Sequence, residues 1–165
     1  MRFVYTACLY LLAACKARSA GTWYLDYPMN ANFTILDHFN NDVVSPGGDG
    51  IIEVKPNTTH RWLFEYLYED AYIIRDSTSH RFIYFPEIKE GAVATVSEKA
   101  ATVLHPYIPE NALGRILVLT EGSAFFFTVG PYSPEEPNRR VIKLVKNYSD
   151  DDRQFSFIKK PKNGN

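Results

Sequence analysis

Cysteine is absent from the sequence beyond residue 15, because Cys8 and Cys15 are its only two cysteines. A small exported scaffold held by disulfides is therefore excluded for the rest of the chain, which must be stabilised by its own core. The composition provides for such a core, since 45% of the 165 residues are hydrophobic and 15% are aromatic. We expect one globular domain with a closed, well-packed sheet.

An excess of either charge is also absent. Lys and Arg number 18 against 19 for Asp and Glu, which gives a formal net charge of -1. Without a net field, the chain has no general attraction for nucleic acid or an anionic membrane. The runs Asp150–Asp152 and Lys159–Lys162 are too short to change this. We therefore predict that neither nucleic acid nor a membrane is a partner.

Catalytic and metal-binding motifs are missing as well. The histidines are scattered, with neither H-E-x-x-H nor an i, i+4 pair: His38, His60, His80 and His105. Four aspartates fall at predicted turns, where their side chains cap backbone donors: Asp26, Asp37, Asp49 and Asp76. The run Gly47–Gly50 lacks the Lys and Ser/Thr of a phosphate-binding loop. We predict no enzymatic activity, no cofactor and no metal site.

Residues 1–19 have the pattern of a signal peptide. A charge at Arg2 precedes the apolar run Phe3–Ala14, and small residues for cleavage follow at Ala17 and Ser19. The apolar run is shorter than the roughly 20 residues of a membrane-spanning helix. We predict secretion and no membrane attachment after cleavage. The alternative is a bacterial lipobox, Leu12-Ala13-Ala14-Cys15, in which Cys15 carries a lipid anchor.

Three sequons for N-glycosylation favour a eukaryotic secretory route over the lipobox. Their acceptor residues are Asn32, Asn57 and Asn147.

The clearest strand pattern lies in residues 60–76, HRWLFEYLYEDAYIIRD. Trp62, Phe64 and Tyr66 alternate with less apolar neighbours, and Tyr72 and Ile74 alternate in the same way after a turn. Alternation on both sides of a turn predicts two paired strands.

A repeat of this pattern runs through the sequence. Residues 23, 25, 33 and 35 are apolar, and so are residues 72, 74, 82 and 84, at a constant offset of 49; Phe125 and Phe127 begin a third instance. We therefore predict three units of about fifty residues with four short strands each, at about 21–70, 71–123 and 124–161 of a single domain, 20–165. The one helical candidate is Ser97–Leu104, which ends before His105-Pro106.

Threefold repetition of four-stranded units predicts an all-β protein of β-trefoil fold, in which six strands close a barrel and three hairpins cap it. The stretches Glu53-Val54-Lys55-Pro56, Trp62-Leu63-Phe64 and Ala71-Tyr72-Ile73-Ile74 resemble the small fungal trefoil protease inhibitors, the mycocypins and their serine-protease-inhibiting relatives. More loosely, the chain resembles ricin B-type lectins. Their Q-x-W signature is approached only by Gln154-Phe155-Ser156, where the Trp is missing.

A lipocalin-like barrel is the alternative fold, because Gly21-Thr22-Trp23-Tyr24 is similar to the G-x-W-Y opening of lipocalins. It would make the protein a small-ligand carrier.

Loops on a rigid barrel are the expected place for binding residues. The glycine-rich segment 45–50 allows close backbone approach, and the predicted long loop Gly130–Arg140 contains three prolines that reduce its entropy loss on docking. The candidate binding residues are Ser45, Pro46, Gly47, Gly48, Asp49, Tyr132, Pro134, Asn138, Arg139 and Arg140. The resemblance implies a protease inhibitor whose partner is an extracellular protease, and we predict a monomer. If the stiffened loop docks in the protease, Arg139 or Arg140 would enter an acidic pocket. The alternative from the same fold is a lectin with a glycan partner.

Overall fold

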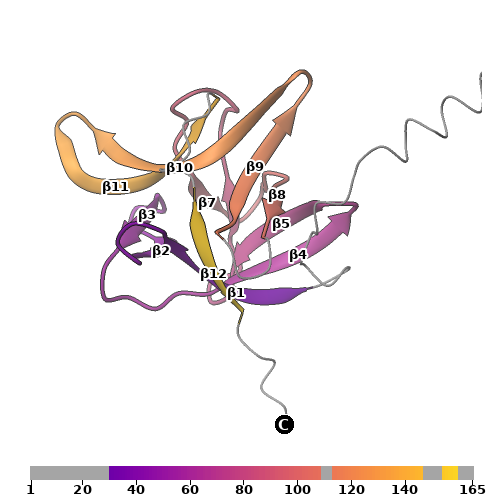
Figure 1. The fold of residues 1–165 in the computed structure, drawn as a ribbon, viewed down its shortest axis with the longest axis horizontal. Helices are drawn as coiled ribbons and strands as arrows, with labels where there is room; N and C mark the ends of the chain where they lie inside the picture. Colours follow the sequence, from indigo (N-terminus) through magenta and orange to yellow (C-terminus); the bar gives the residue numbers. More distant parts are fainter. Residues whose placement is uncertain (1–29, 109–112, 147–153, 160–165) are drawn as a thin grey trace, which may run out of the picture.

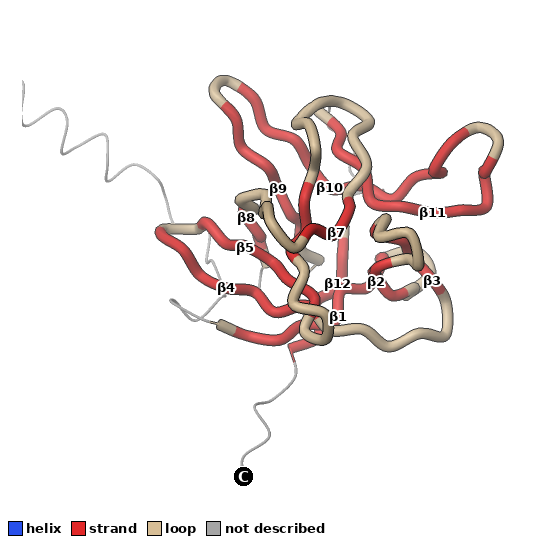
Figure 2. The backbone as a smooth tube through the Cα atoms, turned by 180° about the vertical axis from the view of Figure 1, so that it is seen from behind, coloured by secondary structure: helices blue, strands red, loops and turns tan. Residues whose placement is uncertain are grey.

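The computed structural model describes residues 30–108, 113–146 and 154–159. Figure 2 shows only strands and loops among them. The strands are β1 (Ala31–Asp37), β2 (Val43–Pro46), β3 (Ile52–Lys55), β4 (Trp62–Tyr68), β5 (Ala71–Asp76), β6 (Phe82–Tyr84), β7 (Thr95–Ser97), β8 (His105–Tyr107), β9 (Arg115–Thr120), β10 (Ser123–Ser133), β11 (Glu136–Val145) and β12 (Phe155–Lys159). Within the described ranges there is no helix long and apolar enough to span a membrane. The predicted signal peptide, and residues 23 and 25 of the predicted repeat, lie outside these ranges.

Six strands, β1, β4, β5, β8, β9 and β12, pair in a closed ring (Figure 1). Two joints of the ring are single bridges, Tyr72 with Leu104 and Gly114 with Phe155. Each is held by two backbone hydrogen bonds of 2.8 or 2.9 Å. Closure leaves these strands without an open edge, which removes a site for edge-to-edge aggregation.

The other six strands form three hairpins, β2–β3, β6–β7 and β10–β11, which pair with one another across one end of the barrel. The bridges between hairpins join Ile51 to Thr95, Val93 to Lys143 and Val141 to Glu53. At their meeting point Ile52, Ala94 and Ile142 are fully buried, and the N–H groups of Ile52 and Ala94 donate to the carbonyls of Ala94 and Ile142 at 2.9 Å. A six-stranded barrel capped by three hairpins is a β-trefoil, which confirms the predicted fold.

The interior of the barrel is filled by alternate side chains of the ring strands. Trp62, Phe64 and Phe155 are 0 or 1% exposed, and the Trp62 indole N–H donates to the Val44 carbonyl at 2.8 Å. Phe33 packs edge-on against Phe64, with ring centroids 4.8 Å apart. Each such side chain contributes about 1.5–3 kcal/mol through burial. Six strands and a filled interior make the lipocalin-like alternative wrong.

The strand pairing also fixes the three units. They are β1–β4, β5–β8 and β9–β12, so the first boundary lies at residues 69–70, beside the predicted one. The third unit begins with β9 at Arg115 and not at residue 124, because β9 pairs with β8 as a ring strand. Alternation looks the same in an opening and a closing strand, so the pattern of residues 115–120 alone does not show which one it is.

Two local predictions are wrong. The helical candidate Ser97–Leu104 is the end of β7 followed by a loop, in which Thr102 Oγ1 accepts the Phe85 N–H at 2.9 Å. The predicted long loop Gly130–Arg140 is a β-hairpin that turns at residues 134–135 and projects from the barrel (Figure 1). Its outer part is only two-stranded, so prolines there leave few ladder bonds unmade.

The turns after β1 and β5 have the same hydrogen bonding. Asn41 N–H donates to the Asp37 carbonyl and His80 N–H to the Asp76 carbonyl, both at 2.9 Å. Asn41 and His80 have φ angles of 55° and 60°. Asp37 and Asp76 therefore occupy equivalent, buried places in the first two units, and Asp76 leads to the candidate site.

Candidate functional site

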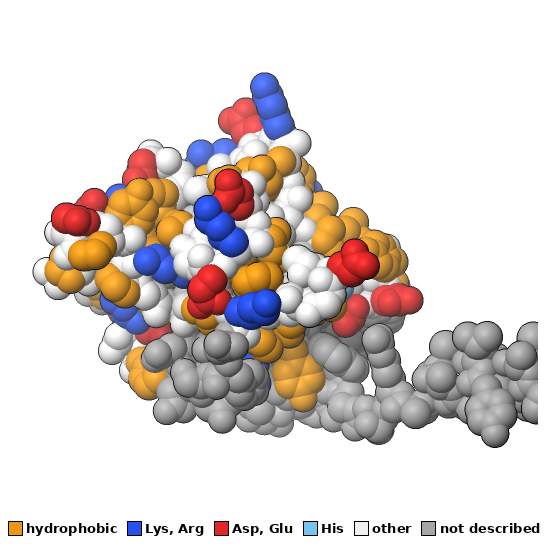
Figure 3. All heavy atoms as spheres, turned by 90° about the horizontal axis from the view of Figure 1, so that it is seen from above, with side chains coloured by type: hydrophobic (Ala, Val, Ile, Leu, Met, Phe, Trp, Pro, Cys, Tyr) orange, Lys and Arg blue, Asp and Glu red, His pale blue; other side chains and the backbone are white. Residues whose placement is uncertain are grey.

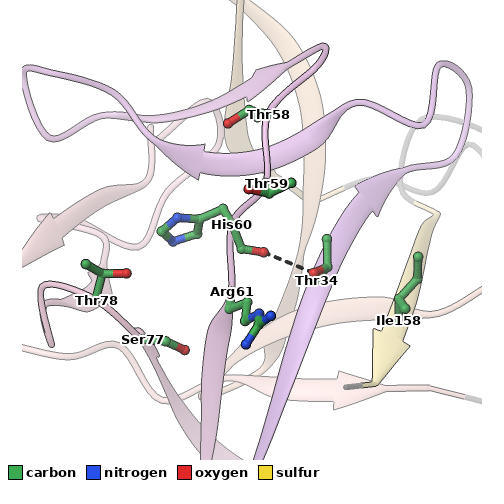
Figure 4. Close-up of a pocket in the computed structure, with 8 residues that line it drawn as sticks. All are labelled: Thr34, Thr58, Thr59, His60, Arg61, Ser77, Thr78 and Ile158. Carbon is green, nitrogen blue, oxygen red and sulfur yellow. Dashed lines mark hydrogen bonds between the residues drawn. The ribbon is translucent and has the colours of Figure 1, made fainter. Parts of the chain in front are cut away.

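A polar cleft of about 620 Å³ lies where the segment before β4 meets the β5–β6 turn, over the outer face of β1 and β12 (Figure 4). Hydroxyl side chains predominate in its walls. The lining residues are Thr34, Thr58, Thr59, His60, Arg61, Ser77, Thr78 and Ile158. Such a surface offers many hydrogen-bond donors and acceptors together with one apolar contact.

Hydrogen bonds between segments fix the shape of the cleft. Thr34 Oγ1 donates to the His60 carbonyl at 3.1 Å, as Figure 4 shows, and Ser77 N–H donates to the Arg61 carbonyl at 3.0 Å. Ser77 Oγ donates to Asn32 Oδ1 at 2.7 Å. These bonds join β1, the entry to β4 and the β5–β6 turn, so the walls of the cleft are arranged before any ligand binds.

Asp76 is buried beneath the cleft and holds the β5–β6 turn in place. It is 4% exposed, and its carboxylate accepts hydrogen bonds from Thr78 N–H at 2.8 Å and Ser79 Oγ at 2.6 Å. Burial raises the pKa of Asp76, but these hydrogen bonds and the nearby His60 outweigh it and hold the pKa below its ordinary value. Asp76 is therefore ionised at neutral pH and orders the turn that carries Thr78.

The imidazole of His60 lies between this carboxylate and the core. Its ring meets Trp62 edge-on at a centroid distance of 4.9 Å, and Nε2 lies 3.4 Å from Asp76 Oδ1 without hydrogen-bond geometry. Burial lowers the pKa of His60 below its ordinary value, although the Asp76 charge opposes this. At neutral pH the ring is uncharged, and Nε2 has no hydrogen-bond partner among the described residues.

Several polar groups of the cleft are available to a ligand. The hydroxyls of Thr58, Thr59 and Thr78 make no hydrogen bond to the described residues, and Thr59 and Thr78 are exposed. Arg61 is exposed and has no ion-pair partner among the described residues. The cleft thus combines fixed walls with unengaged donors.

A second cluster joins the two segments that contain the predicted binding residues. Arg139 Nη2 lies 2.5 Å from Asp49 Oδ2 and 2.7 Å from Glu53 Oε1, and its guanidinium carbon lies 4.6 Å from the centroid of the Tyr132 ring. Glu53 also pairs with Lys55. The side-chain hydrogen bond from Arg139 lowers the pKa of Asp49. Arg139 thus forms ion pairs with two carboxylates of its own chain, those of Asp49 and Glu53.

Arg140 is engaged in the same way. Its Nη2 lies 2.7 Å from Asp37 Oδ2, and its Nη1 lies 2.8 Å from Asp42 Oδ2. On the face shown in Figure 3, basic and acidic side chains lie interspersed, often next to one another. Entry of Arg139 or Arg140 into a protease pocket would first require these ion pairs to break, so their geometry gives the inhibitor hypothesis no support.

Three of the other candidate residues in segment 45–49, Ser45, Pro46 and Gly47, lie in or beside strand β2 and are packed against the protein. Ser45 and Pro46 belong to β2, and Ser45 is 6% exposed. A Cβ at Gly47 would lie 2.5 Å from Glu53 Oε1, so a larger residue here would displace the Glu53 carboxylate, whereas Gly48 has open space around it.

Of the candidates on the β10–β11 hairpin, Pro134 and Asn138 are exposed, and Tyr132 lines a groove of about 380 Å³ beside Ile51 and Val93. Whether any of these residues binds a partner stays a prediction.

Two predicted glycosylation sites flank the cleft. Asn32 and Asn57 are exposed, and Thr34, Thr58 and Thr59 of their sequons line the cleft itself. Asn147 lies outside the described residues.

The cleft was not predicted from the sequence. Its residues come from two short polar stretches, Thr58–Arg61 and Ser77–Thr78, and from single positions on β1 and β12. The only local signal is the clustering of hydroxyl residues, which is equally common in exposed turns. Within the described ranges, no group of three His, Cys, Asp or Glu side chains is placed to hold a metal ion.

Comparison with solved structures shows chains of similar fold. No family model matches the sequence, and no curated protein matches it either. Among solved structures, the Rhizoctonia solani agglutinin superposes with a TM-score of 0.63 at 13% identity, covering 80% of this chain and 96% of the agglutinin. The Macrolepiota procera ricin B-like lectin, solved in complex with lactose, gives 0.61 at 14% identity and covers 78% and 94% of the two chains.

The Polyporus squamosus lectin gives a TM-score of 0.63 at 13% identity, and the match covers 79% of this chain and 49% of that lectin. These likenesses establish that the fold is the β-trefoil found in ricin B-like lectins.

Proposed function

We propose that the protein is a non-enzymatic glycan-binding protein, exported from the cell, and that the polar cleft is its binding site. The observation that carries the proposal is the cleft itself: preformed walls with the unengaged hydroxyls of Thr58, Thr59 and Thr78 beside the exposed apolar side chain of Ile158. Saccharides present hydroxyls around a ring with apolar C–H faces, and such a surface complements both. The lectin neighbours support the same function, since they share this fold.

The test is a glycan array probed with the purified protein, followed by titration calorimetry with the saccharides that bind. Loss of one hydrogen bond weakens binding by about twofold to tenfold. We therefore expect Thr59→Val and Thr78→Val to reduce affinity by about that factor each, because valine has nearly the same shape without the hydroxyl.

The control is Thr120→Val, which changes an exposed threonine at the end of β9, outside the cleft. Unchanged affinity in both cleft variants, or absence of any bound glycan on the array, would contradict the proposal.

The protease inhibitor remains a second, untested hypothesis, to be checked against a panel of serine and cysteine proteases. Because Arg139 and Arg140 are held by carboxylates of their own chain, we expect no inhibition of trypsin-like enzymes. Tight inhibition that is lost in an Arg139→Ala, Arg140→Ala double variant would restore the inhibitor interpretation.

A further inference from the structure

Arg61, the arginine that lines the polar cleft, differs from other arginines of the protein in its ion pairing. Arg61 is exposed, and none of the described carboxylates pairs with it. By contrast, Arg75 lies 2.5 Å from Glu65, and Arg139 and Arg140 each contact two carboxylates at 2.5 to 2.8 Å. Arg61 therefore differs from these arginines, because no carboxylate among the described residues occupies its guanidinium, which can bind an external anion.

The acidic group of the cleft does not compete for this guanidinium. Asp76 is almost completely buried, and its two oxygens accept hydrogen bonds from Thr78 and Ser79. Among the described residues that line the cleft there is no Asp or Glu. Of these lining residues, Arg61 is thus the one that presents a charge at neutral pH, and that charge is positive.

Strand register places three kinds of contact side by side on the outer face of the barrel. Thr34 is paired with Ile158 on β12, and Phe33 is paired with Trp62 on β4. In an antiparallel pair the next position brings Arg61 opposite Thr34. A guanidinium, a hydroxyl and an apolar side chain that is 46% exposed therefore follow one another across neighbouring strands, as Figure 4 shows.

The Arg61 guanidinium can donate two parallel hydrogen bonds to a planar carboxylate, and it also binds sulfate. Ile158 offers a surface for the C–H face of a sugar ring, and Thr34, Ser77 and Thr78 lie within the same cleft as partners for ring hydroxyls.

We propose that the cleft selects saccharides that carry a negatively charged group, with Arg61 as the residue that binds the anion. This inference rests on the proposed glycan-binding function and names the class of its ligand.

The test compares three probes by titration calorimetry at pH 7: methyl β-D-glucuronide, glucose 6-sulfate and the neutral methyl β-D-glucoside. We expect the anionic probes to bind more tightly than the neutral one. Arg61→Gln should lower affinity for the anionic probes by about tenfold to a hundredfold, and affinity for the neutral probe by no more than the roughly twofold to tenfold of one lost neutral hydrogen bond. Arg61→Lys, which keeps the charge but loses the planar fork, should fall between, with the larger loss for the carboxylate.

Lys99→Gln is the control for net charge, because Lys99 is exposed and does not line the cleft. Arg61 is exposed too, so its variants should fold, which unfolding midpoints will verify. Equal affinity for neutral and anionic probes, or an equal loss in Lys99→Gln, overturns the inference and leaves the proposed function standing. If neither class binds and the array is blank, both fail.

Discussion

The buried carboxylate of Asp76 should stabilise the whole domain through the turn that forms one wall of the cleft. Replacing it by asparagine keeps the shape of the side chain but removes its charge and one acceptor. A hydrogen bond to a charged group contributes about 1.5–3 kcal/mol, against about 0.5–1.5 kcal/mol for a neutral one. With two such bonds at 2.6 and 2.8 Å, we expect Asp76→Asn to lower the free energy of unfolding by about 2 kcal/mol at pH 7.

The assay is equilibrium unfolding in urea, followed by tryptophan fluorescence. With an m-value of about 2 kcal/mol/M, the loss shifts the midpoint by about 1 M. Glu87→Gln is the control, since Glu87 is exposed and Lys89 is its ion-pair partner among the described residues, so the unfolding midpoint of this variant should not move.

The dependence on pH gives the sharper test. The pKa of Asp76 is lowered from 3.8 in the folded protein, so its stabilisation is complete above the unfolded value and is lost as pH falls through the folded one. The gap between wild type and Asp76→Asn should therefore close as pH falls below 3.8. A gap that is absent at pH 7, or just as large at pH 3, would refute the reasoning.

Three further predictions concern ring closure, titration and modification. Gly114→Ala should destabilise the domain by about 1–3 kcal/mol, because the added Cβ would lie 2.7 Å from a backbone carbonyl, whereas Gly48→Ala, with open space around it, should be neutral in thermal unfolding. Burial lowers the pKa of His60 in the folded protein from 6.5, so as pH falls the unfolded chain binds a proton on His60 before the folded protein does. The free energy of unfolding should therefore decrease below pH 6.5 in the wild type, and less so in His60→Gln. Urea midpoints at pH 7 and pH 5 measure this difference. Expression through a eukaryotic secretory pathway should give N-glycans at Asn32 and Asn57, detected by mass spectrometry before and after enzymatic deglycosylation; unmodified asparagines would remove that prediction.

Most ring strands could be predicted because their alternation is local. Trp62 and Phe64 alternate with less buried neighbours in β4, and this period of two is visible in the sequence. β2 and β8 cannot be recognised in this way, since each is short and contains a proline, Pro46 or Pro106, which argues against a strand. Both strands exist because the barrel and its hairpins supply partners that a propensity argument does not include.

Residues 130–140 were predicted to be a loop, but they form a β-hairpin. Three prolines and several polar residues are typical of a loop, yet β10 and β11 extend through Pro131 and Pro137. The anchor is the buried end of the same strands, where Ile142 and Leu144 are fully buried. Pairing that begins in the core continues outward, which local composition does not reveal.

The sequence by itself predicted an all-β domain of repeated strands with a core independent of disulfides, because side-chain periodicity and composition are properties of the chain. The alignment of the repeat at an offset of 49 was wrong, since Phe33 and Ile35 lie on β1, which corresponds to β5, and Phe82 and Tyr84 lie on β6. Only the tertiary structure decided which charges are free. Arg139 and Arg140 look available in the sequence but are held by carboxylates about a hundred positions away. Arg61, by contrast, lies beside hydroxyls from another unit and has no carboxylate partner among the described residues. Electrostatic pairing depends on distances in space, which ring closure and strand register set, and so the candidate site emerged only from the folded barrel.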